Sequence, residues 1–144
     1  MTIVCGYTDR PEARAALEFA IEEARVRGTE LRIIRTIVEP STSDSPSAVQ
    51  SWSTTVQQAR DEGQSLVDSL TGRSISATFE VEVCRSDSVA ERLLDATRQL
   101  DASLLVIGLR RRSPVGKLVL GSVSQELLLG ADCPVVAVKA DDDV

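Results

Sequence analysis

Short apolar runs alternate along the chain with longer stretches in which apolar residues recur every three or four positions. The short runs are typical of strands, and the three-and-four spacing is typical of amphipathic helices. The pattern predicts strands at residues 2–6, 30–38, 77–83, 104–108 and 134–139. It predicts helices at residues 11–27, 49–70, 89–100 and 121–131, with a polar loop at 41–48.

Strands that alternate with helices in this way indicate right-handed crossovers and a parallel sheet covered on both faces. The 144 residues fit one domain, so we expect a single-domain, doubly wound α/β fold with five strands over residues 1–144. Ligands of such folds bind at the carboxyl ends of the strands, where the strand order reverses. In this chain those ends are residues 6–8, 38–39, 84–87 and 108 onward.

Composition excludes several classes of function. The chain has no histidine, which removes Ser-His-Asp and Cys-His catalysis and most zinc sites. Its net charge of −6 and its 3% aromatic content argue against nucleic acid as a partner. The three dispersed cysteines, Cys5, Cys84 and Cys133, favour buried thiols in a reducing compartment. With no long apolar run, we expect a cytoplasmic protein that does not enter a membrane.

One basic, glycine-containing segment stands out in this acidic chain. Residues 108–124 read GLRRRSPVGKLVLGSVS, with Arg110, Arg111, Arg112 and Lys117 close together. Gly121 and Ser122 then open a helix whose free N–H groups form an anion site. A solvated surface patch and ordinary turn geometry are the alternative readings. A P-loop is excluded, because Arg111 stands at its first glycine position and a leucine follows Lys117.

The chain resembles the universal stress proteins, small α/β domains many of which bind ATP or AMP. The resemblance covers IVCGYTDRPEARAALEFA at the start and VIG…GKLVLGSVSQELLLGADCPVVAVK at the end. It implies the strand order 3-2-1-4-5, a backbone contact from Val38 to adenine, and a loop that holds phosphate and ribose. The positions in that loop are Gly108, Gly121, Ser122, Val123 and Ser124, with Arg110 and Arg111 beside them as cations.

Two positions depart from the family pattern. Thr8 stands where the family carries an aspartate near the ribose, and Arg111 stands at the second glycine of the loop. Two hypotheses follow: a regulatory module that binds ATP or AMP, with or without magnesium, or a dimeric scaffold that has lost nucleotide binding. We assign no catalytic residue and no metal ligand, and at most slow ATP hydrolysis.

The sequence of the last predicted strand indicates that the protein pairs with another chain. The run PVVAV within residues 134–139 is apolar, and an edge strand of this kind needs cover. The resemblance implies that it pairs with its twofold mate, so we expect a homodimer. The alternative is that residues 140–144 fold across this edge, although we expect that tail to be disordered.

Overall fold

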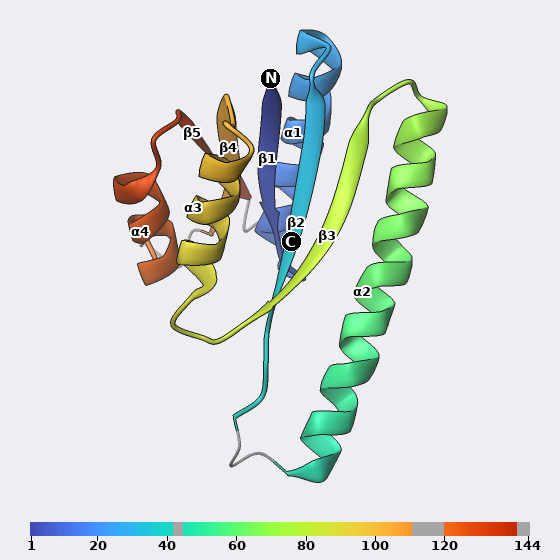
Figure 1. Cartoon of the computed structure of the whole chain (residues 1–144), viewed down its shortest axis with the longest axis vertical. Helices are drawn as coiled ribbons and strands as arrows, with labels where there is room; N and C mark the ends of the chain where they lie inside the picture. The colour runs from blue at the N-terminus through green and yellow to red at the C-terminus, as the bar shows by residue number, and fades with distance from the viewer. Residues whose placement is uncertain (42–44, 111–119, 141–144) are drawn as a thin grey trace.

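Strands and helices alternate throughout the computed structural model, which describes residues 1–41, 45–110 and 120–140 (Figure 1). The strands are β1 (Thr2–Tyr7), β2 (Glu30–Val38), β3 (Ala77–Cys84), β4 (Leu104–Arg110) and β5 (Val135–Ala140). The helices are α1 (Pro11–Arg27), α2 (Pro46–Gly72), α3 (Val89–Gln99) and α4 (Ser122–Gly130). The α/β alternation predicted from hydrophobic periodicity is therefore confirmed.

The five strands form a parallel sheet in the order β3-β2-β1-β4-β5, as expected. β1 lies between β2 and β4, and its Ile3 is in register with Leu31 on one side and Leu104 on the other. The chain moves outward from β1 through β2 to β3 and then crosses to β4. The strand order reverses between β1 and β4, which places the expected ligand site at their carboxyl ends.

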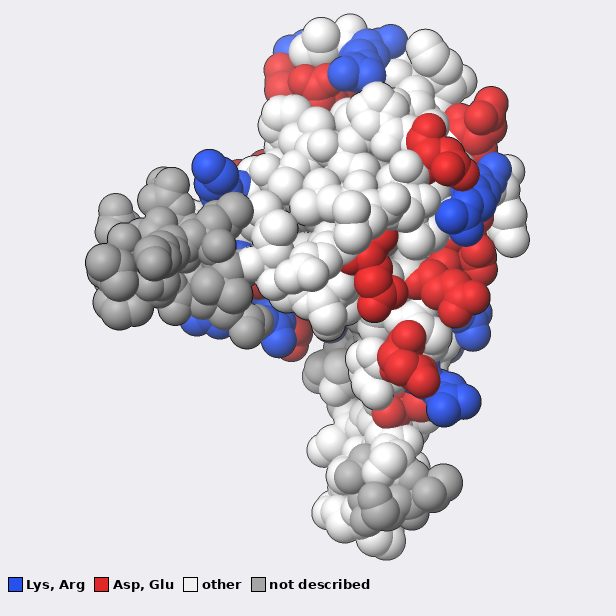
Figure 2. Space-filling model, turned by 90° about the vertical axis from the view of Figure 1, so that its left-hand side faces the viewer, with Lys and Arg blue, Asp and Glu red and all other residues white. Residues whose placement is uncertain are grey.

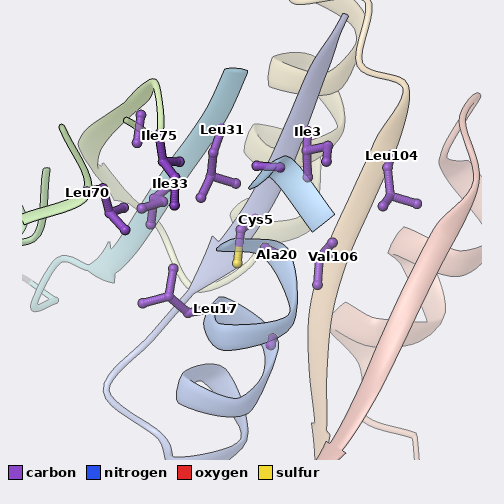
Figure 3. Packing of buried hydrophobic residues seen from close by; sticks show 13 residues of the cluster. Ile3, Cys5, Leu17, Ala20, Leu31, Ile33, Leu70, Ile75, Leu104 and Val106 are labelled. Carbon is purple, nitrogen blue, oxygen red and sulfur yellow. The ribbon is translucent and has the colours of Figure 1, made fainter. Parts of the chain in front are cut away.

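Each face of the sheet is covered by two helices, because alternate strand residues point to opposite faces. On one face Ile3 and Cys5 of β1 pack with Leu17 and Ala20 of α1 (Figure 3). On the other face Val4 belongs to a cluster with residues of α3 and α4. α2 packs against β3 on the α1 face and runs beyond the end of the sheet (Figure 1).

The start of α2 differs from the sequence-based expectation of a polar loop through residue 48. The helix begins at Pro46, since Ser45 adopts an extended conformation and its Oγ accepts a hydrogen bond from the Ala48 amide at 3.3 Å. Proline suits the first helical position, where its missing N–H would have no partner. The second half of the expected loop is thus the first turn of α2.

Smaller corrections concern the end of the chain. Ala140 is the last residue of β5, paired with Arg110, rather than the first residue of a disordered tail. Residues 141–144 lie outside the described part. Cys5 and Cys84 are buried as predicted, but Cys133 is half-buried, because it lies in the turn before the edge strand. No described helix has both the length and the apolar character that spanning a membrane requires.

Candidate functional site

A cavity of about 450 Å³ lies at the carboxyl ends of β1 and β4, within the size range of small-molecule sites. Three segments supply most of its wall: the end of β1 with the start of α1, the end of β4, and the start of α4. The lining residues of these segments are Gly6, Tyr7, Thr8, Arg10, Glu12, Ala13, Ile107, Gly108, Leu109, Arg110, Gly121, Ser122, Val123, Ser124 and Leu127. Thr36 of β2 and Val89 and Leu93 of α3 complete it.

The cavity combines apolar and cationic surface. Leu93, Ile107 and Leu127 are buried side chains of the core, and they line it with apolar surface. Arg10 and Arg110 also line it, and both are exposed to solvent. A ligand with a flat apolar part and an anionic part would match both kinds of surface.

The first turn of α4 lies at the wall of the cavity. Gly121 is the N-cap residue in an extended conformation, and no side chain of the described residues caps the first turn. Gln125 instead donates its side-chain amide to the Leu120 carbonyl oxygen at 3.1 Å. The first amides of a helix lack intrahelical acceptors and lie at the positive end of the helix dipole. These amides are therefore available to an anion in the cavity.

The turn between β1 and α1 uses the hydroxyl of Thr8. Its Oγ1 accepts a hydrogen bond from the Arg10 amide at 3.3 Å, just before Pro11 begins α1. This bond holds Thr8 in the wall of the cavity. Thr8 keeps a proton that it can donate to a ligand, but it supplies no negative charge.

Most residues predicted from the sequence meet in this cavity. They are Thr8, Gly108, Arg110, Gly121, Ser122, Val123 and Ser124. Val38 does not line it, and its side chain, at the end of β2, is 46% exposed. Arg111 lies outside the described residues.

Sequence reasoning missed Arg10, Glu12 and Thr36, which also line the cavity, whereas Tyr7 lies within the strand end at residues 6–8 that it indicated. Glu12 is the least expected, because it is an acidic residue and yet only 8% exposed. Its position next to Pro11 suggested no more than a favourable charge at the start of a helix. The topology could have indicated it, since α1 starts at the carboxyl end of β1 and its first turn therefore faces the ligand edge.

The cysteines lie outside the cavity wall and are poor nucleophiles. Burial raises the pKa of the Cys5 thiol from 9.0 to about 12, and it also raises the pKa of Cys84 and of Cys133. The thiolate, which is the reactive form, is therefore scarce at neutral pH. Within the described residues no three histidine, cysteine or acidic side chains cluster as a metal site would require. The arrangement suits noncovalent binding.

Comparison with known proteins agrees with the fold and the motifs. The model of the universal stress protein family matches residues 1–139. A universal stress protein of Mycolicibacterium smegmatis is 41% identical over 137 residues, covering 95% of this chain and 96% of that protein.

Two solved structures share the fold at lower identity. A universal stress protein from Archaeoglobus fulgidus in complex with dAMP is 22% identical with a TM-score of 0.63, covering 96% of this chain and 98% of that one. A family protein from Arabidopsis thaliana with AMP bound is 15% identical with a TM-score of 0.66, covering 99% and 94% of the two chains. By its match to the family model and to the mycobacterial relative, this chain belongs to the universal stress protein family.

Proposed function

We propose that the protein is a regulatory module that binds an adenosine nucleotide, AMP or ATP, in the cavity between β1 and β4. The observation that carries the proposal is the uncapped start of α4 at Gly121, which opens into a cavity of about 450 Å³. The nucleotides named for the Archaeoglobus and Arabidopsis proteins support the choice of adenosine.

The described residues fit such a ligand. The amides of Ser122, Val123 and Ser124 and the guanidinium group of Arg110 would hold phosphate oxygens. The apolar side chains of Leu93 and Ile107 would receive the less polar part of the nucleotide. With no histidine in the chain, we expect ATP hydrolysis to be slow at most.

Calorimetric titration with AMP and with ATP, each with and without magnesium, tests the proposal. We expect saturable binding, which absence of binding at millimolar nucleotide would contradict. That result would favour a scaffold that has lost its ligand.

A charge variant locates the site. Ser122→Glu places a carboxylate at the first residue of α4, where the helix dipole favours it but a phosphate is repelled. We expect its affinity for AMP to fall at least about tenfold, since one close like charge opposes roughly 1.4 kcal/mol of binding. Ser47→Glu is the matched control, because it adds the same charge to the first turn of α2, where Ser47 is exposed and does not line the cavity. Equal affinities of the two variants would place the phosphates elsewhere.

We further propose that two copies pair through β5. This strand is at the edge of the sheet, and Val135, Val136, Ala137 and Val138 remain partly exposed in the single chain. Figure 2 shows the face of the molecule that carries β5 and α4. Few charged side chains lie at the centre of this face. Light scattering should give twice the chain mass of 15.5 kDa, and the mass of one chain would contradict the pairing.

A further inference from the structure

β3 is an open edge of the sheet. It pairs with β2 on one side, and no described strand pairs with it on the other. The carbonyl oxygens of Ser76 and Cys84 accept hydrogen bonds at 2.9 Å from the amides of Leu31 and Glu39, on the β2 side. Backbone groups of successive strand residues alternate in direction. The odd-numbered residues of β3 therefore direct their N–H and C=O groups to the open edge.

A groove of about 440 Å³, the β3 groove, follows this edge and separates β3 from α2, which lies beside it (Figure 1). Its wall includes Thr78, Phe79 and Val81 of β3 and Gly63, Gln64 and Val67 of α2. Thr78 and Phe79 are successive strand residues whose side chains point to opposite faces of the sheet, yet both line the groove. The groove therefore opens along the edge of the strand rather than over one face.

The β3 groove combines free backbone groups with an apolar wall. A strand edge with free N–H and C=O groups is the surface to which an extended chain adds as a further strand. Phe79, Val81 and Val67 are half-buried apolar side chains on the α2 side of this edge. An extended polypeptide matches both features, because it supplies backbone partners and side chains at a period of two residues.

The charges beside the groove determine which side chains an added strand should carry. Glu80 and Glu82 project from the opposite face of β3, where their side chains are 40% and 37% exposed. Their ion-pair partners, Arg32 and Arg92, come from β2 and α3 rather than from the open edge. Arg60, on α2, is the charged residue in the groove wall. Because opposite charges across neighbouring strands stabilise a sheet and like charges destabilise it, basic residues of an added strand belong on the face of the two carboxylates.

We propose that the β3 groove binds an extended segment of another protein as an added strand beside β3. The segment carries apolar residues toward α2 and lysine or arginine at the alternate positions toward Glu80 and Glu82. A second copy of β3 does not fit, because pairing over its whole length would place Glu80 opposite Glu80 or Glu82 of the other chain. The groove shares no lining residue with the nucleotide cavity, so this inference is independent of the proposed function.

Peptide titration tests the inference. Calorimetry compares two capped hexapeptides, one of alternating lysine and valine and one of alternating glutamate and valine. We expect saturable binding and a preference of about tenfold or more for the lysine peptide, whose charges face Glu80 and Glu82. In the double variant Glu80→Gln/Glu82→Gln the preference should fall below about threefold. The control Glu18→Gln/Glu22→Gln removes two charges from exposed positions of α1 and should keep the preference. An equal preference in the two double variants would overturn the proposed charge recognition.

A bulky substitution on α2 locates the peptide. Gln64 and Gln57 are exposed residues of α2, and each donates its side-chain amide to an aspartate four residues later, at 2.9 Å and 3.0 Å. Gln64 lines the groove and Gln57 does not. Gln64→Trp should fill the groove and weaken binding of the lysine peptide at least about tenfold, whereas Gln57→Trp should change it less than about twofold. Circular dichroism verifies that each variant is folded. Equal affinities of the two variants, or no binding to the wild type at millimolar peptide, would overturn the inference.

Amide hydrogen exchange at single residues distinguishes an added strand from other modes of binding. In the free protein the amides of Phe79 and Val81 point to the open edge and should exchange faster than those of Glu80 and Glu82, which point to β2. The lysine peptide should slow exchange at Phe79 and Val81 at least about tenfold and leave the two glutamates unchanged. Unchanged exchange at Phe79 and Val81 with bound peptide overturns strand addition. Protection of these amides without peptide, rising with protein concentration, also overturns it, because a second copy would then occupy the groove.

Discussion

A Cβ atom on Gly108 would lie 2.4 Å from the backbone carbonyl oxygen of Glu12, closer than real Cβ atoms approach other atoms. β4 and the first turn of α1 therefore pack so closely that glycine is required at position 108. The φ angle of Gly108 is not the reason for the glycine, because among the described glycines only Gly28 has a positive φ. At Gly121 a Cβ atom would meet no atom of the described residues within 4 Å, so their packing places no such demand there.

This contrast predicts different effects for two alanine variants. Gly108→Ala should lower the free energy of unfolding by about 1–3 kcal/mol, the usual cost of overpacking. Gly121→Ala should change it by less than about 1 kcal/mol, the difference between glycine and alanine at an N-cap, while its methyl group weakens nucleotide binding. Urea unfolding and AMP titration measure the two effects. Equal destabilisation by the two variants would contradict the assignment of Gly108 to packing and Gly121 to the ligand.

The ring of Phe79 fills the space beside Gly63, in the middle of α2. A Cβ atom at position 63 would lie 2.1 Å from this ring. Alanine is the better helix former by about 1 kcal/mol. We nevertheless expect Gly63→Ala to destabilise the protein by about 1–2 kcal/mol, because displacing Phe79 also disturbs its edge contact with Tyr7. Urea unfolding followed by circular dichroism provides the measurement.

Two variants control that experiment. Gly72→Ala, at the last residue of α2, meets nothing within 4 Å and should leave stability unchanged or raise it. In a Phe79→Leu background the effect of Gly63→Ala should shrink, since the smaller side chain can move aside. An undiminished effect in that background would show that the ring of Phe79 is not the obstacle.

The fold could be predicted from the sequence because its signals are local. Strand and helix periodicities each lie within one element, and they placed most boundaries within two residues of those observed. The glycine at position 63 of α2 could not be explained in this way, because the reason for it is the ring of Phe79, 16 positions later on another element. The start of α2 was missed although Ser45 and Pro46 form a recognisable cap signal.

The site was predictable where topology decides it. The rule that ligands bind at the carboxyl ends of strands led to residues 6–8, 38–39, 84–87 and 108 onward. Residues 6–8 and 108–110, where the strand order reverses, line the cavity, and the other two strand ends do not. Val38 was chosen by resemblance, and the cavity does not extend to it. Thr36 was missed because it lies in an apolar strand, where a single hydroxyl group does not indicate a binding site. Glu12 was missed although topology places the first turn of α1 at the ligand edge of the sheet. Its burial could not be predicted, because it depends on the approach of α1 to β4.

The Cys5 thiol should make stability depend on pH in alkaline solution. Its pKa is about 12 in the folded protein, raised by burial from an ordinary 9.0. The unfolded chain releases this proton first, so the contribution is complete below pH 9 and declines as the pH rises from 9 toward 12. The slope is up to about 1.4 kcal/mol per pH unit.

Urea unfolding at pH 8, 9 and 10 measures that slope. Cys5→Ala should be less stable by about 1 kcal/mol at pH 8 because of the lost volume, but its stability should decline less steeply with pH. Cys133→Ala, at a half-buried position, should keep most of the wild-type slope. Identical slopes in the wild type and Cys5→Ala would refute the assignment to Cys5.

The indole N–H of Trp52 is buried and donates to no acceptor in the described residues. The ring packs against the buried cluster of Ile37, Val56 and Ala59, to which β3 also contributes contacts, so its apolar contacts, rather than its polar group, stabilise α2 against the sheet. Trp52→Phe should therefore stay within about 1 kcal/mol of the wild type, because removing the unpaired N–H offsets the lost area. Trp52→Ala should lose at least about 2 kcal/mol of stability.

Because Trp52 is the single tryptophan, circular dichroism must follow unfolding. If Trp52→Phe lost as much stability as Trp52→Ala, the N–H would have an acceptor in solution, and the beginning of α2 would be held by a polar contact as well as by packing.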